Sequence, residues 1–315
     1  MNQFISIRNL FPYQFHNMIS GLENRMDKLQ EIRLRVNAPV IYVIDKKEYY
    51  PAKDGTLLVT PSDAVIPDVN DIEAIFNHIC NYSPYAYETQ LRQGYLTVAG
   101  GHRVGMFGQI VLEDEKVMLL KQVQFLHIRI VHEILGVAKP IIEHLFQEQV
   151  FLNTLIVSPP GVGKTTMLRD LARMISDGSN KRCGLQVCII DERSEIAGCY
   201  MGVPQNKVGI RTDVLDGCPK AIGMSMAIRA MGPQVLVVDE LGLLEDYKAL
   251  YYASGCGVSL LASAHGNTPA DVFAKSPWTK ERFMEVFSRF LVLQWSNGRP
   301  GWKLYDEKGE LVAKS

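Results

Sequence analysis

The sequence lacks a membrane-spanning segment, because no run of about 18 apolar residues is free of charged ones. The most apolar stretch, near residues 123–142, carries Arg129, Glu133 and Lys139. The six cysteines include no Cys-x-x-Cys pair, and the opening residues, MNQFISIRNLFPYQF, do not resemble a secretory leader. We therefore expect a protein of the reducing cytoplasm, which associates with membranes only peripherally and through partners.

An excess of basic charge is also missing. The chain has 33 Lys and Arg side chains against 34 Asp and Glu. Both halves are balanced, with 14 against 17 in residues 1–150 and 19 against 17 in residues 151–315. A protein that binds the phosphates of nucleic acid usually presents a concentrated basic surface. The even distribution predicts no nucleic-acid partner.

A change of composition divides the chain near residue 135. The length of 315 residues and a hydrophobic content of 47% allow two domains with full cores. Before the change, β-rich segments surround one helical stretch at residues 70–82, which predicts a small α+β domain over residues 1–135. The β-rich segments are residues 28–44, 95–99 and 104–112.

Residues 136–315 begin with a Gly and Pro break and a helix predicted at residues 141–147. Continuously apolar strands that alternate with helices follow, which is typical of a parallel sheet covered on both faces. The predicted fold class of this domain is therefore α/β. The expected strands are residues 154–157, 186–190, 235–238 and 259–262, followed by a hairpin over residues 290–305 that turns at Asn297 and Gly298.

The first of these strands leads into a phosphate-binding loop and then a helix, as this motif requires. The loop consists of Ser158, Pro159, Pro160, Gly161, Val162, Gly163, Lys164, Thr165 and Thr166. Its glycines let backbone N–H groups surround phosphates, Lys164 reaches the β and γ oxygens, and the Thr165 hydroxyl binds Mg²⁺. ATP and Mg²⁺ are thus the expected cofactors. Ser158 replaces the usual first glycine, and a positive φ there would strain it.

Two acidic residues end the strand at residues 235–238. Ligands gather at the carboxyl ends of parallel strands, so we expect Asp239 to hold the metal through water. Glu240 is expected to orient the attacking water. A glutamate directly after the aspartate points to ATP hydrolysis rather than to a one-way nucleotide switch.

Polar residues also follow the two neighbouring strands. Glu192 and Glu195 either act on water or metal, or form ordinary ion pairs with Arg193 in their own loop. His265 follows the strand at residues 259–262 and is predicted to sense the γ-phosphate.

These motifs resemble the stage III sporulation protein AA family of endospore-forming bacteria and, more distantly, the traffic ATPases of secretion and pilus retraction. The most specific segment is residues 208–233, and further signatures lie at residues 28–35 and 94–105. The resemblance implies a RecA-like P-loop NTPase domain after a smaller α+β domain. It also implies a hexamer in the mother-cell cytoplasm that serves membrane-embedded components of a transport apparatus between mother cell and forespore.

Arginines are the remaining candidates. In the traffic ATPases, arginines of the N-terminal domain help to bind nucleotide, and Arg103 and Arg129 stand in comparable places. An arginine delivered across a subunit boundary can also stabilise phosphoryl transfer. Arg211 and Arg229, on the connection before the acidic strand, join the first two as candidates, with Arg229 and Arg103 preferred.

Other functions compete with a transport ATPase. A nucleic-acid-directed RecA-like ATPase would use the same hydrolytic residues, but it would carry a basic stripe or an aromatic and arginine cluster. The intact phosphate loop disfavours a degenerate ATPase kept as a scaffold. A zinc protease is not supported, because the pattern that begins at His132 and Glu133 would need a histidine where Gly136 stands.

Overall fold

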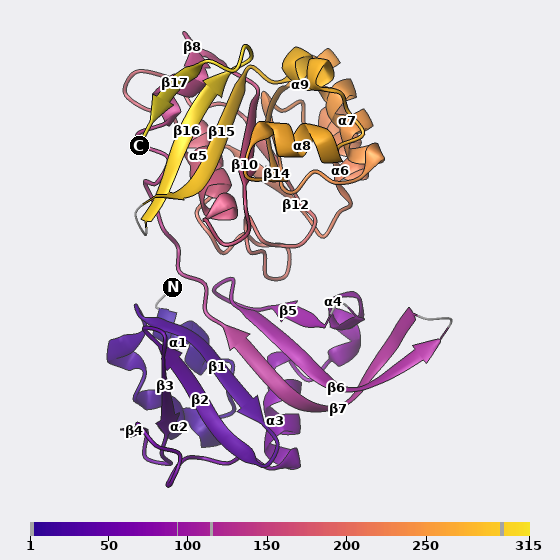
Figure 1. Cartoon of the computed structure of the whole chain (residues 1–315). Helices are drawn as coiled ribbons and strands as arrows, with labels where there is room; N and C mark the ends of the chain where they lie inside the picture. The colour runs from indigo at the N-terminus through magenta and orange to yellow at the C-terminus, as the bar shows by residue number, and fades with distance from the viewer. Residues whose placement is uncertain (1–2, 93, 114–115, 297–298) are drawn as a thin grey trace. The chain divides into compact units, whose positions relative to one another are not determined.

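The computed structural model describes residues 3–92, 94–113, 116–296 and 299–315 of the chain (Figure 1). The chain forms two compact units. The N-terminal unit comprises residues 1–132 and 198–205, and the C-terminal unit comprises residues 133–197 and 206–315. The sequence pattern placed a single boundary near residue 135 and gave no sign of the excursion at residues 198–205. Within the described ranges, no helix has the length and apolar character needed to cross a bilayer.

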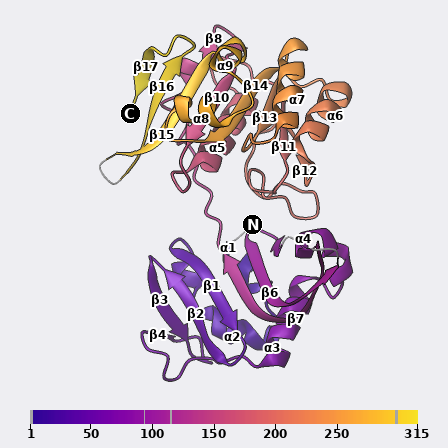
Figure 2. The same cartoon turned by 45° about the vertical axis from the view of Figure 1, so that its right-hand side comes forward.

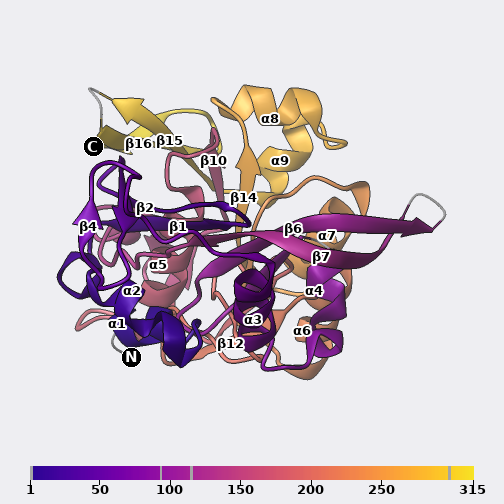
Figure 3. The same cartoon turned by 90° about the horizontal axis from the view of Figure 1, so that it is seen from below.

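The N-terminal unit is an α+β domain built on an antiparallel sheet of order β4-β3-β2-β1-β7-β6-β5. Its strands are β1 (Leu29–Arg35), β2 (Ala38–Ile44), β3 (Lys47–Pro51), β4 (Leu57–Leu58), β5 (Tyr95–Thr97), β6 (Arg103–Glu113) and β7 (Lys116–Arg129). Its helices are α1 (Gln3–Arg8), α2 (His16–Ser20), α3 (Val69–Ile79) and α4 (Glu88–Arg92). Figure 3 shows the long β6–β7 hairpin running past α3 and α4.

Local sequence explains the main elements of this unit. Asp68 and Asp71 form a reciprocal capping box at the start of α3, and the helix buries Ile72, Ile75 and Ile79 at helical spacing. Strand β2 alternates buried and half-buried residues, as expected of a sheet with one face on the core. The predicted helix at residues 70–82 and the predicted strands are confirmed.

The C-terminal unit is an α/β domain with a sheet of order β12-β11-β13-β14-β10-β15-β16-β17 (Figure 2). The first six strands in this order, which end with β15, are parallel to one another. Strands β16 and β17 are added antiparallel to their neighbours. The strands are β10 (Thr154–Ser158), β11 (Val187–Asp191), β12 (Thr212–Asp216), β13 (Val235–Val238), β14 (Ser259–His265), β15 (Arg289–Ser296), β16 (Arg299–Asp306) and β17 (Leu311–Lys314). The helices are α5 (Lys164–Asp177), α6 (Lys220–Ala230), α7 (Leu244–Gly255), α8 (Pro269–Lys275) and α9 (Lys280–Val286).

Both faces of this sheet are covered, which explains why its strands are continuously apolar. One face, which includes Val157, Ile190 and Val238, shares a buried core with α6, α7, α8 and α9. The alternate residues, such as Ile156 and Ile189, are equally buried, and α5 packs along β10, β11 and β14. The predicted α/β fold with a parallel sheet, preceded by a smaller α+β domain, is confirmed.

One predicted element differs from the structure, and one agrees with it. The helix predicted at residues 141–147 is wrong: a 3₁₀ turn at Ile142–Leu145 runs into a small hairpin of β8 (Phe146–Gln147) and β9 (Val150–Phe151). The C-terminal hairpin is confirmed by the antiparallel pair β15 and β16. Its predicted turn residues, Asn297 and Gly298, lie outside the described residues.

Candidate nucleotide-binding site

The phosphate loop connects β10 to α5 and leaves its glycines open to a ligand. Gly161 and Gly163 have φ values of 77° and 102°, which favour glycine. Apart from chain neighbours, no atom lies within 4 Å of the place that a Cβ would take on either glycine. This open backbone at the start of α5 fits a chain of phosphates. Ser158 ends β10 without a positive φ, and its Oγ donates to the Pro159 carbonyl at 2.8 Å, so the serine is not strained.

Lys164 lies buried below the loop and binds the acidic strand end. Its Nζ donates to Asp239 Oδ1 at 2.7 Å and to Ser263 Oγ at 3.1 Å. Thr165 Oγ1 donates to Asp239 Oδ2 at 3.2 Å. The first turn of α5, the end of β13 and the middle of β14 therefore meet at one carboxylate.

The Asp239 side chain is ionised in this environment. Burial alone would raise the pKa of Asp239, but the charge and hydrogen bond of Lys164, together with the hydroxyls of Ser263 and Thr165, lower it. A carboxylate beside a threonine hydroxyl supplies the oxygen ligands that Mg²⁺ prefers. The residues present thus fit the metal expected from the sequence.

Glu240 has an unusual backbone and two partners for its carboxylate. Its φ of 52° places it in the left-handed region, and its N–H donates to Ser263 Oγ at 2.9 Å. Oε2 lies 3.0 Å from Arg193 Nη1, and Oε1 lies 3.6 Å from His265 Nε2. His265 Nδ1 lies 3.4 Å from the Ser158 carbonyl oxygen. The structure thus brings Glu240 and His265 together beside the phosphate loop.

The loop after β11 is organised by Asp191. Its buried carboxylate accepts the backbone N–H groups of Glu195, Ile196 and Ala197 at 2.8 to 3.0 Å. Burial raises the pKa of Asp191, and these three hydrogen bonds oppose the rise. Asp191 therefore shapes the loop that carries Arg193 and Glu195.

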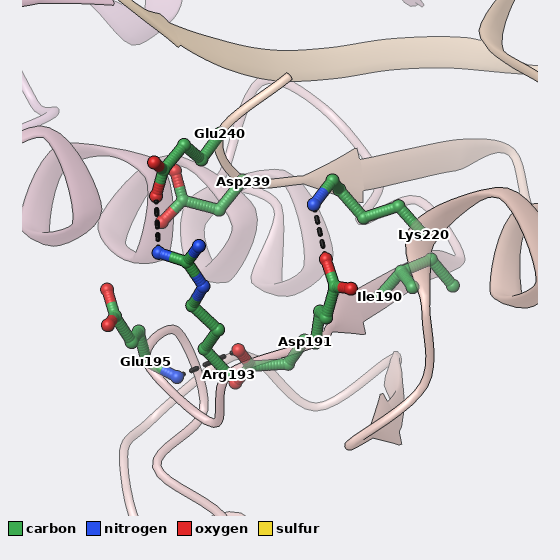
Figure 4. Close-up of a pocket in the computed structure, with 8 residues that line it drawn as sticks. Ile190, Asp191, Arg193, Glu195, Lys220, Asp239 and Glu240 are labelled. Carbon is green, nitrogen blue, oxygen red and sulfur yellow. Dashed lines mark hydrogen bonds and ion pairs between the residues drawn. The ribbon is translucent and has the colours of Figure 1, made fainter. Parts of the chain in front are cut away.

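The two glutamates of this loop have different surroundings, and Figure 4 labels Glu195 together with Arg193 and Glu240. Glu192 forms an ion pair with Lys220, which begins α6. Glu195 lines the same small pocket as Asp239 and Glu240, and Arg193 extends across this pocket to Glu240. Glu192 thus pairs with a lysine outside its own loop rather than with Arg193 as the second reading expected, and Glu195 lines the pocket at the acidic strand end.

The four candidate arginines lie in different environments. Arg211 Nη1 donates to the carbonyl of Ser176 at 3.0 Å, at the end of α5 opposite the phosphate loop. Arg229 is exposed in the last turn of α6. Arg103 and Arg129 are cross-strand partners on β6 and β7 of the N-terminal unit. The structure therefore does not bring Arg211 or Arg229 to the loop of their own chain.

An apolar cavity of about 370 Å³ adjoins the phosphate loop. Its lining residues are Ile134, Val137, Val162, Gly163, Thr166, Met167, Leu293, Pro300, Gly301, Trp302 and Ser315. The volume is within the range of small-ligand sites, and an aromatic ring with aliphatic neighbours suits a flat heterocycle. The cavity is thus a candidate site for the base of a nucleotide.

Ser263, Lys220 and Trp302 lay outside the predicted set of site residues. The sequence signal for Ser263 is the polar Ser-x-His pattern that ends the apolar strand SLLASAH, a pattern that already pointed to the phosphate site. Lys220 becomes visible only when α6 is placed beside the acidic strand end. Trp302 lies far along the sequence from the loop that it adjoins.

A parallel sheet with a phosphate loop beside an acidic strand end is typical of a P-loop NTPase fold. The ATPase DotB of Legionella pneumophila is similar, with a TM-score of 0.57 and 14% identity over 94% of this chain and 82% of that one. The pilus retraction motor PilT, solved with bound ADP, gives a TM-score of 0.58 and 15% identity over 90% of this chain and 81% of that one. At this level of identity the likeness shows the fold.

The family follows from sequence. Residues 2–312 match the family described as sporulation stage III, protein AA. The stage III sporulation protein AA of Bacillus subtilis (strain 168) is 40% identical over 313 residues, which are 98% of this chain and 97% of that protein. The chain belongs to the sporulation stage III protein AA family, as its motifs predicted.

Proposed function

We propose that this protein hydrolyses ATP in a Mg²⁺-dependent reaction. The observation that carries the proposal is the convergence of Lys164 and Thr165 on Asp239, 2.7 and 3.2 Å away, directly before Glu240. A P-loop lysine, a metal-binding hydroxyl and two strand-end carboxylates are the parts that phosphoryl transfer requires.

Binding requires Lys164 to exchange partners. Its ammonium group, now on Asp239, turns to the β- and γ-phosphate oxygens, while the N–H groups of residues 161–165 surround the phosphates. Thr165, and Asp239 through water, would hold Mg²⁺, which would neutralise charge on the same oxygens. The cavity beside Trp302 takes the adenine base.

Hydrolysis depends on Glu240. Its carboxylate accepts a hydrogen bond from the attacking water and so orients it. We propose that His265, whose Nε2 lies 3.6 Å from Glu240 Oε1, senses the γ-phosphate. Glu195, which lines the same pocket, is the second candidate for this role.

The family suggests the biological setting. We propose a homohexamer in the mother-cell cytoplasm that is held peripherally at the membrane by embedded components of a transport apparatus and that energises transport between mother cell and forespore. In such a ring an arginine reaches the site of the neighbouring subunit, and Arg103, Arg129 and Arg229 remain the candidates for nucleotide binding or catalysis in trans.

The alternative is a nucleic-acid-directed ATPase with the same hydrolytic residues. The balanced charge of both halves of the chain favours the transport role. The two are separated by adding single-stranded and duplex DNA to the ATPase assay: salt-sensitive stimulation would support the alternative.

The test of the proposed activity is ATP turnover and ATP binding by the purified full-length protein with and without Mg²⁺. Lys164→Ala should abolish both, because it removes the buried ammonium group that faces the phosphates. Lys181→Ala, at an exposed position of the same unit, is the matched control. Undiminished ATP affinity in Lys164→Ala would contradict the site.

A further inference from the structure

Ser263 is the common partner of three functional residues. Its side chain is fully buried in the middle of β14, next to Ile156 of β10. Oγ donates its hydrogen to Asp239 Oδ1 and accepts from Lys164 Nζ at 3.1 Å and from the Glu240 N–H at 2.9 Å. One donor and two acceptor sites are all that a hydroxyl offers, so its capacity is filled.

The same residue also fixes the backbone around Glu240. The Ser263 carbonyl accepts the N–H of Leu241 at 2.8 Å, while its hydroxyl accepts the N–H of Glu240. Glu240 is therefore held on both sides of its Cα by a single residue of the neighbouring strand. A glutamate in the left-handed region needs such support, because surrounding structure must stabilise that backbone conformation.

Phosphate binding should break one of the three hydrogen bonds of the Ser263 hydroxyl and leave the other two in place. Lys164 must leave Asp239 and Ser263 to reach the phosphate oxygens, whereas the bonds from Ser263 to Asp239 and from Glu240 to Ser263 involve groups that stay in place. After this exchange, the Ser263 hydroxyl still joins the Asp239 carboxylate to the backbone N–H of Glu240. Its bond to Oδ1 leaves Oδ2, on the Thr165 side, to hold the metal through water.

We infer that Ser263 is a positioning residue that holds Asp239 toward the metal and Glu240 toward the water after Lys164 has moved to the phosphates. The inference rests on the proposed ATPase function. It assigns to one buried hydroxyl the coupling of the metal ligand to the water-orienting residue.

Ser263→Ala removes the hydroxyl and little else, because alanine fits the same strand position. We expect kcat to fall by about 10- to 100-fold, the range seen when partners of metal ligands are removed. The KM for ATP should stay within about threefold, because the backbone N–H groups and Lys164 still bind the phosphates. Ser263→Thr keeps the hydroxyl and should recover most of the lost turnover. Ser259→Ala removes a hydroxyl from the same strand, where it binds the Phe151 carbonyl, and is the matched control.

A second readout does not need turnover. The Mg²⁺ concentration that half-maximally tightens binding of a nonhydrolysable ATP analogue should rise by about tenfold in Ser263→Ala, because Asp239 has lost its fixed orientation. It should be unchanged in Ser259→Ala. This titration, with a thermal melt of each nucleotide-free variant, separates positioning from stability.

The results for the Ser263 variants can support or overturn the positioning role of Ser263. A folded Ser263→Ala variant with kcat and Mg²⁺ requirement near those of the wild type would overturn it. So would a loss of turnover that follows a lowered melting temperature and that Ser263→Thr does not restore. If the wild type binds the analogue but hydrolyses nothing, the ATPase proposal fails alone and the Mg²⁺ titration still decides the role of Ser263. If the wild type does not bind the analogue, both proposals fall.

Discussion

Arg193 and Glu240 form an ion pair, with Nη1 and Oε2 3.0 Å apart, between loops that follow the neighbouring strands β11 and β13. The two side chains are 61% and 36% exposed. Exposed pairs of this kind contribute about 0 to 1 kcal/mol, because water screens them. The pair therefore orients the Glu240 carboxylate without locking it, and the carboxylate is free to turn to water when substrate binds.

Glu240→Gln should retain ATP binding and lose hydrolysis. The amide keeps the size of the side chain but not the charge that polarises water, and general-base contributions are typically about 10²- to 10⁴-fold. Turnover and analogue binding should be measured side by side, with exposed Glu245→Gln of α7 as the control. Turnover within a few-fold of wild type would transfer the role to Glu195 or, failing that, to Glu192.

Trp302→Ala should weaken nucleotide binding at unchanged kcat. The indole lines the cavity beside the phosphate loop, and stacking of a base on an aromatic ring is worth about 1 to 3 kcal/mol, so affinity should fall by roughly 5- to 150-fold. Tripolyphosphate carries no base, and its affinity should not change. Equal losses for ATP and tripolyphosphate would mean that the substitution disturbs the loop itself.

Sequence patterns predicted the parts of this site that depend on local motifs. The phosphate loop and the acidic strand end are recognisable separately, and the rule that parallel strands end at one edge brings Lys164 to Asp239. The ion pair of Arg193 and the hydrogen bonds of Ser263 were not predictable, because they depend on distances between β11, β13 and β14.

The elements that sequence missed have identifiable causes. β12 (Thr212–Asp216) is an edge strand of mixed polarity, so it lacks the continuous apolar run that marks β10 or β13. Residues 141–147 are apolar at helical spacing, yet Glu148, with a φ of 56°, turns the chain into the β8–β9 hairpin. The apolar pattern is only two helical turns long, and a helix that short is marginally stable, so the β8–β9 hairpin forms in its place.

A buried histidine makes the N-terminal unit sensitive to acid. Ser6 Oγ gives its hydrogen to the Gln3 carbonyl at 2.7 Å, and Val131 N–H donates to His102 Nδ1 at 3.2 Å. The ring proton of His102 is therefore on Nε2, which donates to Ser6 Oγ at 3.1 Å. Burial, and to a lesser extent the nearby His132, lowers the pKa of His102 to about 4.

Neutral His102 should contribute its full stabilisation above about pH 6.5, which is the pKa of a histidine in the unfolded chain. It should be lost as the pH falls toward 4, because the unfolded state binds the proton first, and the loss amounts to about 3 kcal/mol. Hydrogen exchange of β5 and β6 amides from pH 7 to 4 would measure it. His102→Gln should be less stable at pH 7 but should lack this pH-dependent loss, whereas exposed His144→Gln should behave as the wild type. Identical pH profiles for wild type and His102→Gln would refute the assignment.

The last prediction concerns an arginine that acts in trans. Arg211 is bonded to the end of α5 in its own chain, so Arg211→Ala should lower the melting temperature of the C-terminal unit before it affects turnover. Arg229 is exposed, and Arg103 rests on the ring of Tyr95 at 4.3 Å in the N-terminal unit. Loss of a trans arginine reduces turnover by about 10³- to 10⁵-fold while nucleotide affinity is largely kept.

Mixing variants distinguishes a shared site from a site within one subunit. Glu240→Gln and Arg229→Ala, or Arg103→Ala, should each be inactive alone and regain activity when co-assembled, because some interfaces then combine an intact Glu240 with an intact arginine. In a head-to-tail ring mixed equally at random, about one quarter of the sites are of this kind, so turnover should approach about one quarter of the wild-type value. Mixing two arginine variants of the same position restores nothing and is the control. Arg129→Ala is tested in the same way, because Arg129 lies beside Arg103 across β6 and β7. If none of these mixtures regains activity in rings shown to contain both variants, none of these three arginines acts in trans.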